Sequence, residues 1–326
     1  MYTRDQSVLA KVYVPPMAGV TDSVFRRLTR EILGDKVDQV RLSTEMISSK
    51  GIIYQNNPKR LRLSEDEVGR VVIQLFGHEP ETMAEAARVA EDAGAASIDI
   101  NMGCPVPKIT RGKDGAALMR EPELARRIIL AVSKAVGLPI SVKTRLGWCE
   151  SSKNIESFAQ MLQDAGISSL TIHGRTRAQA YTGQADWEMI AEVNQRLSIP
   201  VFVNGDINDP DKAETAIQKT ACHGVAVARA AIGNPWLVKR ILQKLLGEVL
   251  SKEPSLEEKL SAAARHLELA FEDQGERGVL PLKKHLSKYL SGMPNAAQHR
   301  TSLSNAANYQ EMKRALAKIH QESLQA

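Results

Sequence analysis

Short β-branched runs alternate with longer amphipathic stretches along most of this 326-residue chain. Runs rich in Val and Ile favour buried strands, and the apolar spacing of the stretches between them is typical of helices. Eight such alternations predict a (β/α)8 TIM barrel, with an open, doubly wound sheet as the alternative. No Gly-x-Gly-x-x-Gly run follows the first strand, which favours the barrel. The predicted strands are Val12–Pro16, Gln39–Glu45, Val71–Gly77, Ser97–Asn101, Ile140–Arg145, Leu170–His173, Val201–Asn204 and Gly224–Ala228.

The helical patterns between these strands carry start and stop signals. Asp22 precedes the first helical stretch, and Pro122 lies near the start of the fourth. Gly94, Gly137 and Gly166 lie where helices are expected to end. The sequence predicts helices at Glu79–Ala93, Glu121–Val136, Ile155–Ala165, Trp187–Leu197 and Pro210–Thr220.

Beyond Trp236 the strands stop and only helical patterns remain. Lys252-Glu253-Pro254-Ser255 has the composition of a linker, so we expect a TIM-barrel domain at residues 1–249 and a small all-helical domain at 250–326. The helices predicted here are Leu237–Leu250, Leu256–Gln274, Leu280–Leu290 and Tyr309–His320.

The composition excludes several classes of protein. No run of about 18 apolar residues indicates a membrane span. The polar segment Met1–Lys11 lacks a signal-peptide core, so a cytoplasmic location is expected. Cys104, Cys149 and Cys222 occur singly, which argues against a disulfide framework or a zinc site. Nothing in the sequence indicates an obligate protein partner, and it does not define the oligomeric state.

Polar or conformationally special residues occur at the end of nearly every predicted strand. The C-terminal ends of barrel strands form one mouth, where active sites of this fold lie. Singly, a histidine or lysine there would more often be structural or solvated, so the joint placement carries the argument. These residues are Pro15, Pro16, Met17, Glu45, Gln74, Asn101, Cys104, Lys143, Arg145, His173, Arg175, Asn204, Gly205, Asp206, Ala228 and Arg229.

The run Ile100-Asn101-Met102-Gly103-Cys104-Pro105 places a thiol where the fourth strand opens into a loop. Gly103 allows a sharp turn, and Pro105 biases Cys104 away from helical geometry. Such a thiol can act as a nucleophile or an acid, although a free cysteine is usually a small buried hydrophobe.

The loops after the last two strands favour an anion. Small residues surround Asp206 and Arg229, and the second loop leads into a helix. Phosphates in these barrels often bind there. The mouth has no acidic cluster and the chain has no His-Glu-x-x-His run, so we expect no metal. A phosphate-bearing organic cofactor, with Lys143 and His173 on its ring, explains these residues better.

The positive charge of the chain is concentrated near its C-terminus. The net charge is +5, and from Arg277 onward eight basic residues stand against two acidic ones. That asymmetry suggests a polyanionic partner, with a solvated helical face as the alternative.

Six motifs, in order, resemble the tRNA-dihydrouridine synthases over essentially the whole chain, with the bacterial B-type branch most similar. The motifs are Pro16-Met17-Ala18-Gly19-Val20-Thr21-Asp22, Asn101-Met102-Gly103-Cys104-Pro105, Val142-Lys143-Thr144-Arg145-Leu146-Gly147-Trp148, His173-Gly174-Arg175-Thr176-Arg177, Asn204-Gly205-Asp206-Ile207 and Gly233-Asn234-Pro235-Trp236.

The resemblance implies reduction of specific uridines in tRNA to 5,6-dihydrouridine, with FMN as cofactor and NADPH as reductant. Cys104 would be the catalytic acid and Asn101 would contact the target uracil. The helical domain would help to hold tRNA. The implied cofactor-binding residues are Pro15, Pro16, Met17, Gln74, Lys143, His173, Asn204, Gly205, Asp206, Ala228 and Arg229. The remaining expected substrate contacts are Arg145, Arg175, Arg177, Lys283, Lys284 and Lys288.

Two features depart from the family pattern. Ala228 replaces the usual glycine, and its methyl group is expected to crowd a backbone that approaches phosphate. The loop Val106–Gly115 carries an extra proline and aspartate relative to the usual basic pattern. Neither touches the acid or the ring-binding residues.

Three other activities remain open from the residues. A flavin enzyme acting on a free pyrimidine would have no use for the basic tail. A Schiff-base aldolase would use Lys143, and a non-catalytic RNA-binding protein would not need the residues of the mouth. The sequence does not define which uridine is modified.

Overall fold

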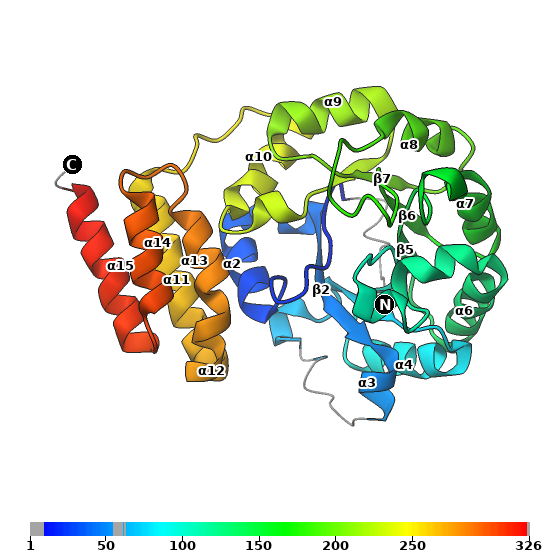
Figure 1. Cartoon of the computed structure of the whole chain (residues 1–326), viewed down its shortest axis with the longest axis horizontal. Helices are drawn as coiled ribbons and strands as arrows, with labels where there is room; N and C mark the ends of the chain where they lie inside the picture. Colours follow the sequence, from blue (N-terminus) through cyan, green and yellow to red (C-terminus); the bar gives the residue numbers. More distant parts are fainter. Residues whose placement is uncertain (1–9, 55–60, 62, 325–326) are drawn as a thin grey trace.

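A closed barrel of eight parallel strands, in sequence order, forms the body of the protein (Figure 1). The computed structural model describes residues 10–54, 61 and 63–324, so most of the polar segment Met1–Lys11 lies outside the described residues. The predicted barrel is confirmed, and the open sheet is excluded. The strands are β1 (Val12–Val14), β2 (Val40–Ser48), β3 (Val71–Phe76), β4 (Ser97–Met102), β5 (Ile140–Arg145), β6 (Ser169–His173), β7 (Val201–Asn204) and β8 (Gly224–Ala226).

Strand β2 differs most from its prediction. It extends past Glu45 to Ser48, and its register with β3 shifts between Ser43 and Met46. Arg41 interrupts the apolar pattern of this strand because its side chain lies inside the barrel. There it donates to the Ser169 and Ser141 hydroxyls at 3.0 and 3.2 Å. Arg41 therefore belongs to a buried polar layer of the barrel.

Helices surround the barrel as predicted, with bounds that differ by a few residues. The Asp22 side chain accepts from the Phe25 N–H and caps the first helix, and Pro122 begins the helix that follows β4 and its loop. The helix that follows β8 begins at Pro235, two residues before its predicted start, and ends at Leu245. The helices are α2 (Ser23–Leu33), α3 (Ser49–Ile53), α4 (Pro80–Asp92), α5 (Pro107–Thr110), α6 (Pro122–Ala135), α7 (Ile155–Asp164), α8 (Trp187–Asn194), α9 (Pro210–Thr220) and α10 (Pro235–Leu245).

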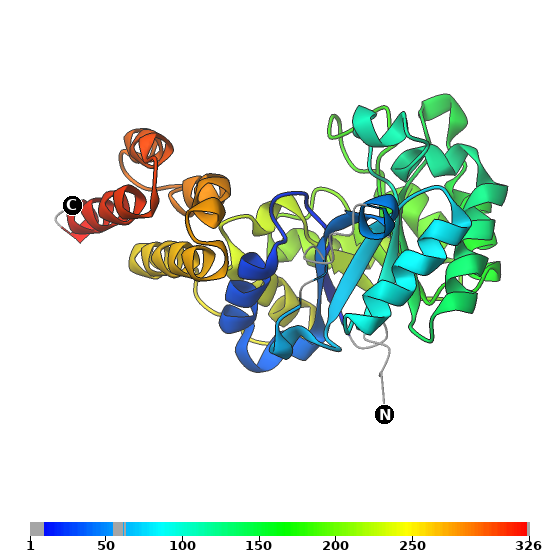
Figure 2. The same ribbon diagram turned by 90° about the horizontal axis from the view of Figure 1, so that it is seen from below.

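A tail of further helices lies beside the barrel, next to α2 and α10 (Figure 2). Helix α14 was not predicted, because its weakly amphipathic sequence lacks an apolar stripe. Among the described residues, no helix is long and apolar enough to cross a membrane. The tail helices are α11 (Leu256–Gln274), α12 (Glu276–Val279), α13 (Lys283–Tyr289), α14 (Ala296–Asn305) and α15 (Tyr309–Leu324).

The tail has its own apolar core and docks on two loops of the barrel mouth. Val24 and Leu28 of α2 pack into the tail core, which otherwise consists of tail residues. A Cβ on Gly233 would lie 2.5 Å from Lys288 Cβ, and one on Gly19 would lie 2.4 Å from Lys284 Nζ. Helix α13 therefore packs directly against the mouth. The predicted division at residues 249 and 250 stays a prediction.

Candidate active site

The C-terminal ends of the strands enclose a cavity of about 710 Å³. This volume lies within the range of small-molecule and cofactor sites. Fifteen of the predicted site residues line it: Pro15, Pro16, Met17, Gln74, Asn101, Cys104, Lys143, Arg145, His173, Asn204, Gly205, Asp206, Ala228, Arg229 and Lys288. Arg175, Arg177, Lys283 and Lys284 are not among the lining residues.

The Cys104 thiol is half-buried in the cavity wall, just after β4. Its backbone N–H donates to Asn101 Oδ1 at 2.9 Å, and Gly103 N–H donates to the same oxygen at 3.1 Å. Burial raises the pKa of the Cys104 thiol, and this outweighs the opposing effect of Arg145 and Lys143. The thiol is therefore protonated at neutral pH and suited to donate a proton rather than to attack as a thiolate.

Asn101 is held by a polar chain that reaches the barrel interior. Its Nδ2 donates to Gln74 Oε1 at 2.7 Å, and Gln74 Nε2 donates to Asp99. Asp99 is fully buried and also accepts from the Ser141 hydroxyl at 2.6 Å. Most of the Asn101 amide is thus occupied by protein groups, and its contact with uracil stays a prediction.

Lys143 is a half-buried cation without a carboxylate partner among the described residues. Its Nζ donates to Asn204 Oδ1 at 3.1 Å, and Asn204 in turn donates to the Ala226 carbonyl at 2.7 Å. Burial lowers the pKa of Lys143 to about 8, and the neighbouring Arg145 acts in the same direction. An anionic ligand in the cavity would supply a counter-charge to Lys143 that the described residues do not, and a ligand carbonyl would accept a hydrogen bond from its Nζ.

Arg175 ties together the loops after β6 and β7. Its Nη2 donates to both oxygens of Asp206 at 2.7 and 2.8 Å and to the Gly183 carbonyl, and its Nε donates to the Thr182 carbonyl at 3.0 Å. Burial would raise the pKa of the Asp206 carboxyl, but the bonds from Arg175 and the Ala185 amide outweigh it and hold it low. The predicted substrate contact of Arg175 stays a prediction, since its guanidinium is committed to protein partners.

The same arginine fixes the proton of His173. Arg175 Nη1 lies 3.2 Å from His173 Nε2, and because a guanidinium only donates, Nε2 must accept. Burial, followed by the nearby cations Lys143 and Arg145, holds the pKa of His173 far below its ordinary value. The ring is therefore neutral with its proton on Nδ1, able to donate one hydrogen bond.

Arg229 begins the short 3-10 turn Arg229–Ala231, between β8 and α10. Its guanidinium lies 4.4 Å from the ring centre of Tyr181, and it forms no ion pair within the described part of the chain. The backbone of Ala228 has φ −105° and ψ −103°, which lies outside both the helical and the extended region. Crowding of a phosphate by the methyl group stays a prediction.

The predicted substrate contacts separate into three kinds. Arg145 lines the cavity while donating to the Gly103 carbonyl at 2.8 Å, and burial lowers its pKa to about 10. Arg177 stacks on Trp148 at 4.5 Å, away from the cavity lining. Lys283 donates to the Ser304 carbonyl at 2.6 Å, whereas Lys288 lines the cavity.

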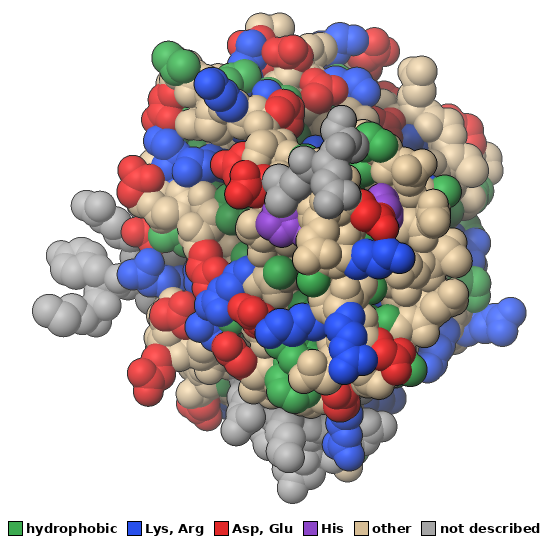
Figure 3. All heavy atoms as spheres, turned by 90° about the vertical axis from the view of Figure 1, so that its left-hand side faces the viewer, with side chains coloured by type: hydrophobic (Ala, Val, Ile, Leu, Met, Phe, Trp, Pro, Cys, Tyr) green, Lys and Arg blue, Asp and Glu red, His purple; other side chains and the backbone are tan. Residues whose placement is uncertain are grey.

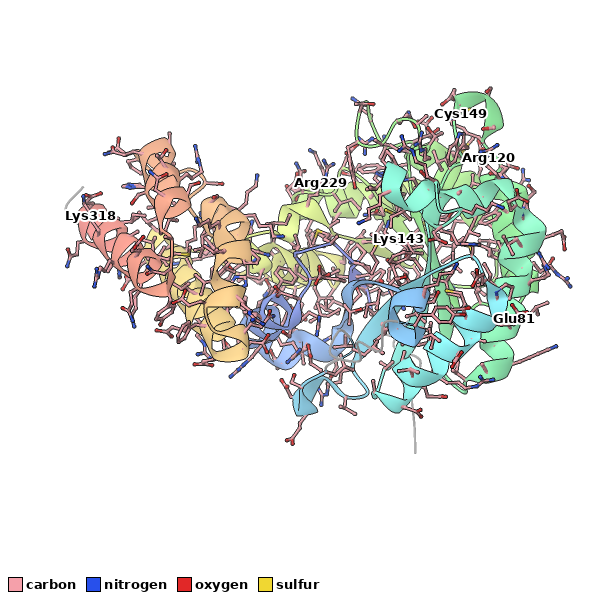
Figure 4. All side chains as sticks on the ribbon, turned by 60° about the horizontal axis from the view of Figure 1, so that its bottom comes forward. Glu81, Arg120, Lys143, Cys149, Arg229 and Lys318 are labelled. Atoms are coloured by element: carbon pink, nitrogen blue, oxygen red, sulfur yellow. The ribbon has the colours of Figure 1, made fainter. Side chains whose placement is uncertain are left out.

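The other two cysteines lie elsewhere, as Figure 4 shows for Cys149 at the rim far from Lys143. The Ser151 and Ser152 hydroxyls lower the pKa of Cys149, which is outside the cavity lining. Cys222 is buried between α9 and β8, and burial raises its pKa to about 11.

Tyr181 is the main residue of the site that the sequence analysis missed. It lies in the long loop between β6 and α8, is 52% exposed, and lines the cavity beside Arg145 and Arg229. Its position in the loop that follows β6 could have indicated a place at the barrel mouth. Met46 was missed because β2 was expected to end at Glu45.

Comparison with known proteins agrees with this geometry. The family model described as "Dihydrouridine synthase (Dus)" matches residues 13–324. The chain belongs to the dihydrouridine synthase family. It is 43% identical to a probable tRNA-dihydrouridine synthase 1 of Synechocystis, over 93% of this chain and 84% of that protein. It is 39% identical to tRNA-dihydrouridine synthase B of Escherichia coli K12, over 89% of this chain and 90% of that protein. The predicted family and enzyme class are thereby confirmed.

A solved 2-naphthoyl-CoA reductase complex is similar in fold alone. It has a TM-score of 0.53 and 12% identity, covering 73% of this chain and 50% of the reductase chain. That likeness supports the barrel architecture and carries no argument about the substrate.

Proposed function

We propose that this protein reduces uridines in tRNA to 5,6-dihydrouridine, using FMN as the hydride carrier and NADPH to re-reduce it. Family membership and the names of the two relatives support the tRNA substrate. The observation that carries the chemistry is that Lys143 and Cys104 face one cavity, the first a cation without a counter-charge and the second a protonated thiol.

The cavity residues fit a flavin mononucleotide. Lys143 and the Nδ1–H of His173 are donors that suit the carbonyl-rich pyrimidine edge of the ring. Arg229 and the following helix start suit the phosphate. When bound, FMN supplies the hydride that C6 of the uracil must receive.

Cys104 then supplies the proton. Addition of a hydride at C6 leaves two electrons at C5, and the S–H bond of Cys104 breaks as the new C5–H bond forms. The thiolate is afterwards reprotonated from solvent. Lys143 would place a positive charge beside the ring of the bound cofactor, and Asn204 already holds its Nζ, so little reorganisation would be needed.

The tail would hold the RNA on the side of the cavity that α13 adjoins. Lys284 and Lys288 are exposed, and both reach the mouth loops. The outer side of the tail shows no continuous patch of positive or of negative charge, because basic and acidic side chains are interspersed over it (Figure 3). Extrusion of the target nucleotide costs a few kcal/mol, which backbone contacts by these lysines would offset.

The test is a spectrum followed by an assay. The purified protein should show flavin absorption or take up FMN, and with NADPH it should form dihydrouridine in tRNA that lacks this modification. A protein that binds no flavin contradicts the cofactor assignment. Flavin binding combined with reduction of free uracil but not of tRNA contradicts the substrate assignment.

A further inference from the structure

The two ends of the segment 104–116, here called the Cys104 loop, contact each other. The Cys104 carbonyl accepts from the Ala116 N–H at 3.1 Å. Gly115 packs so closely that a Cβ there would lie 2.9 Å from that carbonyl. Lys113 and Gly115 have φ angles of +66° and +61°, so the backbone turns sharply on both sides of Asp114. These contacts tie the backbone of Cys104 to the segment that carries Asp114, so the loop forms one compact unit.

A single side-chain pair ties this unit to the neighbouring mouth loop. Asp114 Oδ1 lies 2.8 Å from Nδ1 of His78, which lies between β3 and α4. The two side chains are 17% and 25% exposed, so this contact is sheltered from solvent. Charge-assisted bonds of this kind are stronger than neutral ones.

The surroundings of His78 leave Asp114 as its close partner. Glu79 Oε1 lies 3.9 Å from His78 Nε2, too far for a hydrogen bond, and Glu79 pairs instead with Lys50 Nζ at 2.7 Å. None of these four residues lines the cavity. We therefore expect His78 and Asp114 to affect the reaction through the loops that carry them and not by contact with a ligand in the cavity.

We propose that His78 and Asp114 form a latch that fixes the Cys104 loop and so positions the thiol for proton donation. The two residues are positioning residues for the step assigned to Cys104, and the inference rests on that proposed role.

Asp114→Ala and His78→Ala should each lower turnover on tRNA by roughly ten- to a hundredfold, because small misplacement of a reacting group costs factors of this size. Flavin retention and tRNA affinity should stay unchanged. The Asp114→Ala/His78→Ala double variant should lose little more than either single variant, because both remove the same hydrogen bond. Iodoacetamide should alkylate Cys104 several-fold faster in the latch variants, with Cys149 as internal reference in peptide mass spectrometry.

Two variants sharpen the test. Lys50→Ala removes a charge from the same cluster and leaves the latch, so it should behave like wild type. Asp114→Asn keeps an oxygen that can accept from Nδ1–H, so it should retain much of the turnover. Wild-type turnover and wild-type alkylation of Cys104 in both alanine variants would overturn the latch. Full turnover by Cys104→Ala would instead overturn the acid role, and faster alkylation in the latch variants would still support the latch itself.

Discussion

Two buried arginines of the barrel mouth and two exposed lysines of the tail differ in how their charges are compensated. Arg145 lines the cavity and Arg175 lies behind the lining residues His173 and Asp206; both arginines are buried and donate to backbone carbonyls or to Asp206. On the tail, Lys284 and Lys288 are exposed and form no ion pair within the described part of the chain. Buried, compensated charges preorganise a site, whereas exposed, uncompensated ones remain available to a polyanion. This difference favours the proposed chemistry at the barrel mouth and the proposed binding of a polyanion by the tail.

The largest expected effect lies at the barrel mouth. Cys104→Ala should lower dihydrouridine formation by about 10²- to 10⁴-fold, the usual contribution of a general acid. Reduction of the bound flavin by NADPH, followed by absorbance, should persist because proton delivery comes later. Cys149→Ala is the matched control, since that thiol lies outside the cavity lining. Equal losses in the two variants would contradict the assignment.

The second effect concerns the stability that the barrel mouth draws from its compensated charges. Arg175→Ala would leave the half-buried Asp206, the buried His173 Nε2 and two loop carbonyls without this donor, so the free energy of unfolding should fall by about 2 to 3 kcal/mol. Denaturant unfolding measures this. Arg196→Ala is the control, because that side chain is 63% exposed in its pair with Glu156 and should cost under about 1 kcal/mol. A similar loss of unfolding free energy in both variants would mean that the buried arginine contributes no more to stability than the exposed one.

A third prediction concerns pH. The pKa of Lys143 is lowered to about 8, so its positive charge is present below that pH and disappears as the pH rises through it. If the cation holds FMN, the affinity of the flavin-free protein should fall about tenfold between pH 7 and pH 9 by proton linkage. Fluorescence titration with FMN measures this. Lys143→Arg should keep a high FMN affinity that no longer changes with pH, because arginine stays charged. Lys143→Met should have a low FMN affinity that no longer changes with pH. If the affinity of Lys143→Met still falls with pH, another group causes the pH dependence.

The strand ends were the part of the site that sequence could predict. A parallel barrel brings the C-terminal ends of its strands together whatever their spacing in the chain, so residues as distant as Pro15 and Arg229 fell into one cavity. Helix existence also followed from periodicity. Helix α14 was missed because its pattern is weak, and Tyr181 because a long loop has no period that could place it.

The sequence could not predict which charged side chains already bind other groups of the protein and which remain available to a ligand. Arg175 and Arg177 belong to one motif beside Lys143 and Arg145, yet neither lines the cavity. Lys283 and Lys284 are adjacent, but one donates to the Ser304 carbonyl and the other reaches Gly19. These outcomes depend on packing between segments far apart in the chain, and no local pattern encodes them.

The smallest expected effect tests the tail. Lys284→Ala/Lys288→Ala removes two exposed cations beside the cavity, whereas Lys283 is left in place because it bonds within the tail. Each phosphate that is no longer neutralised should reduce the slope of log affinity against log salt by about 0.7 to 0.9, with a several-fold weaker affinity for tRNA. Lys313→Ala/Lys318→Ala is the matched control, an equal charge change on α15, where Lys318 lies far from the mouth (Figure 4). Binding of labelled tRNA over a salt series should separate the two pairs. Equal salt-dependence slopes for the two double variants would mean that the total positive charge of the tail matters and the position of the lysines does not. The tail would then attract tRNA by its net charge and would have no specific binding site beside the cavity.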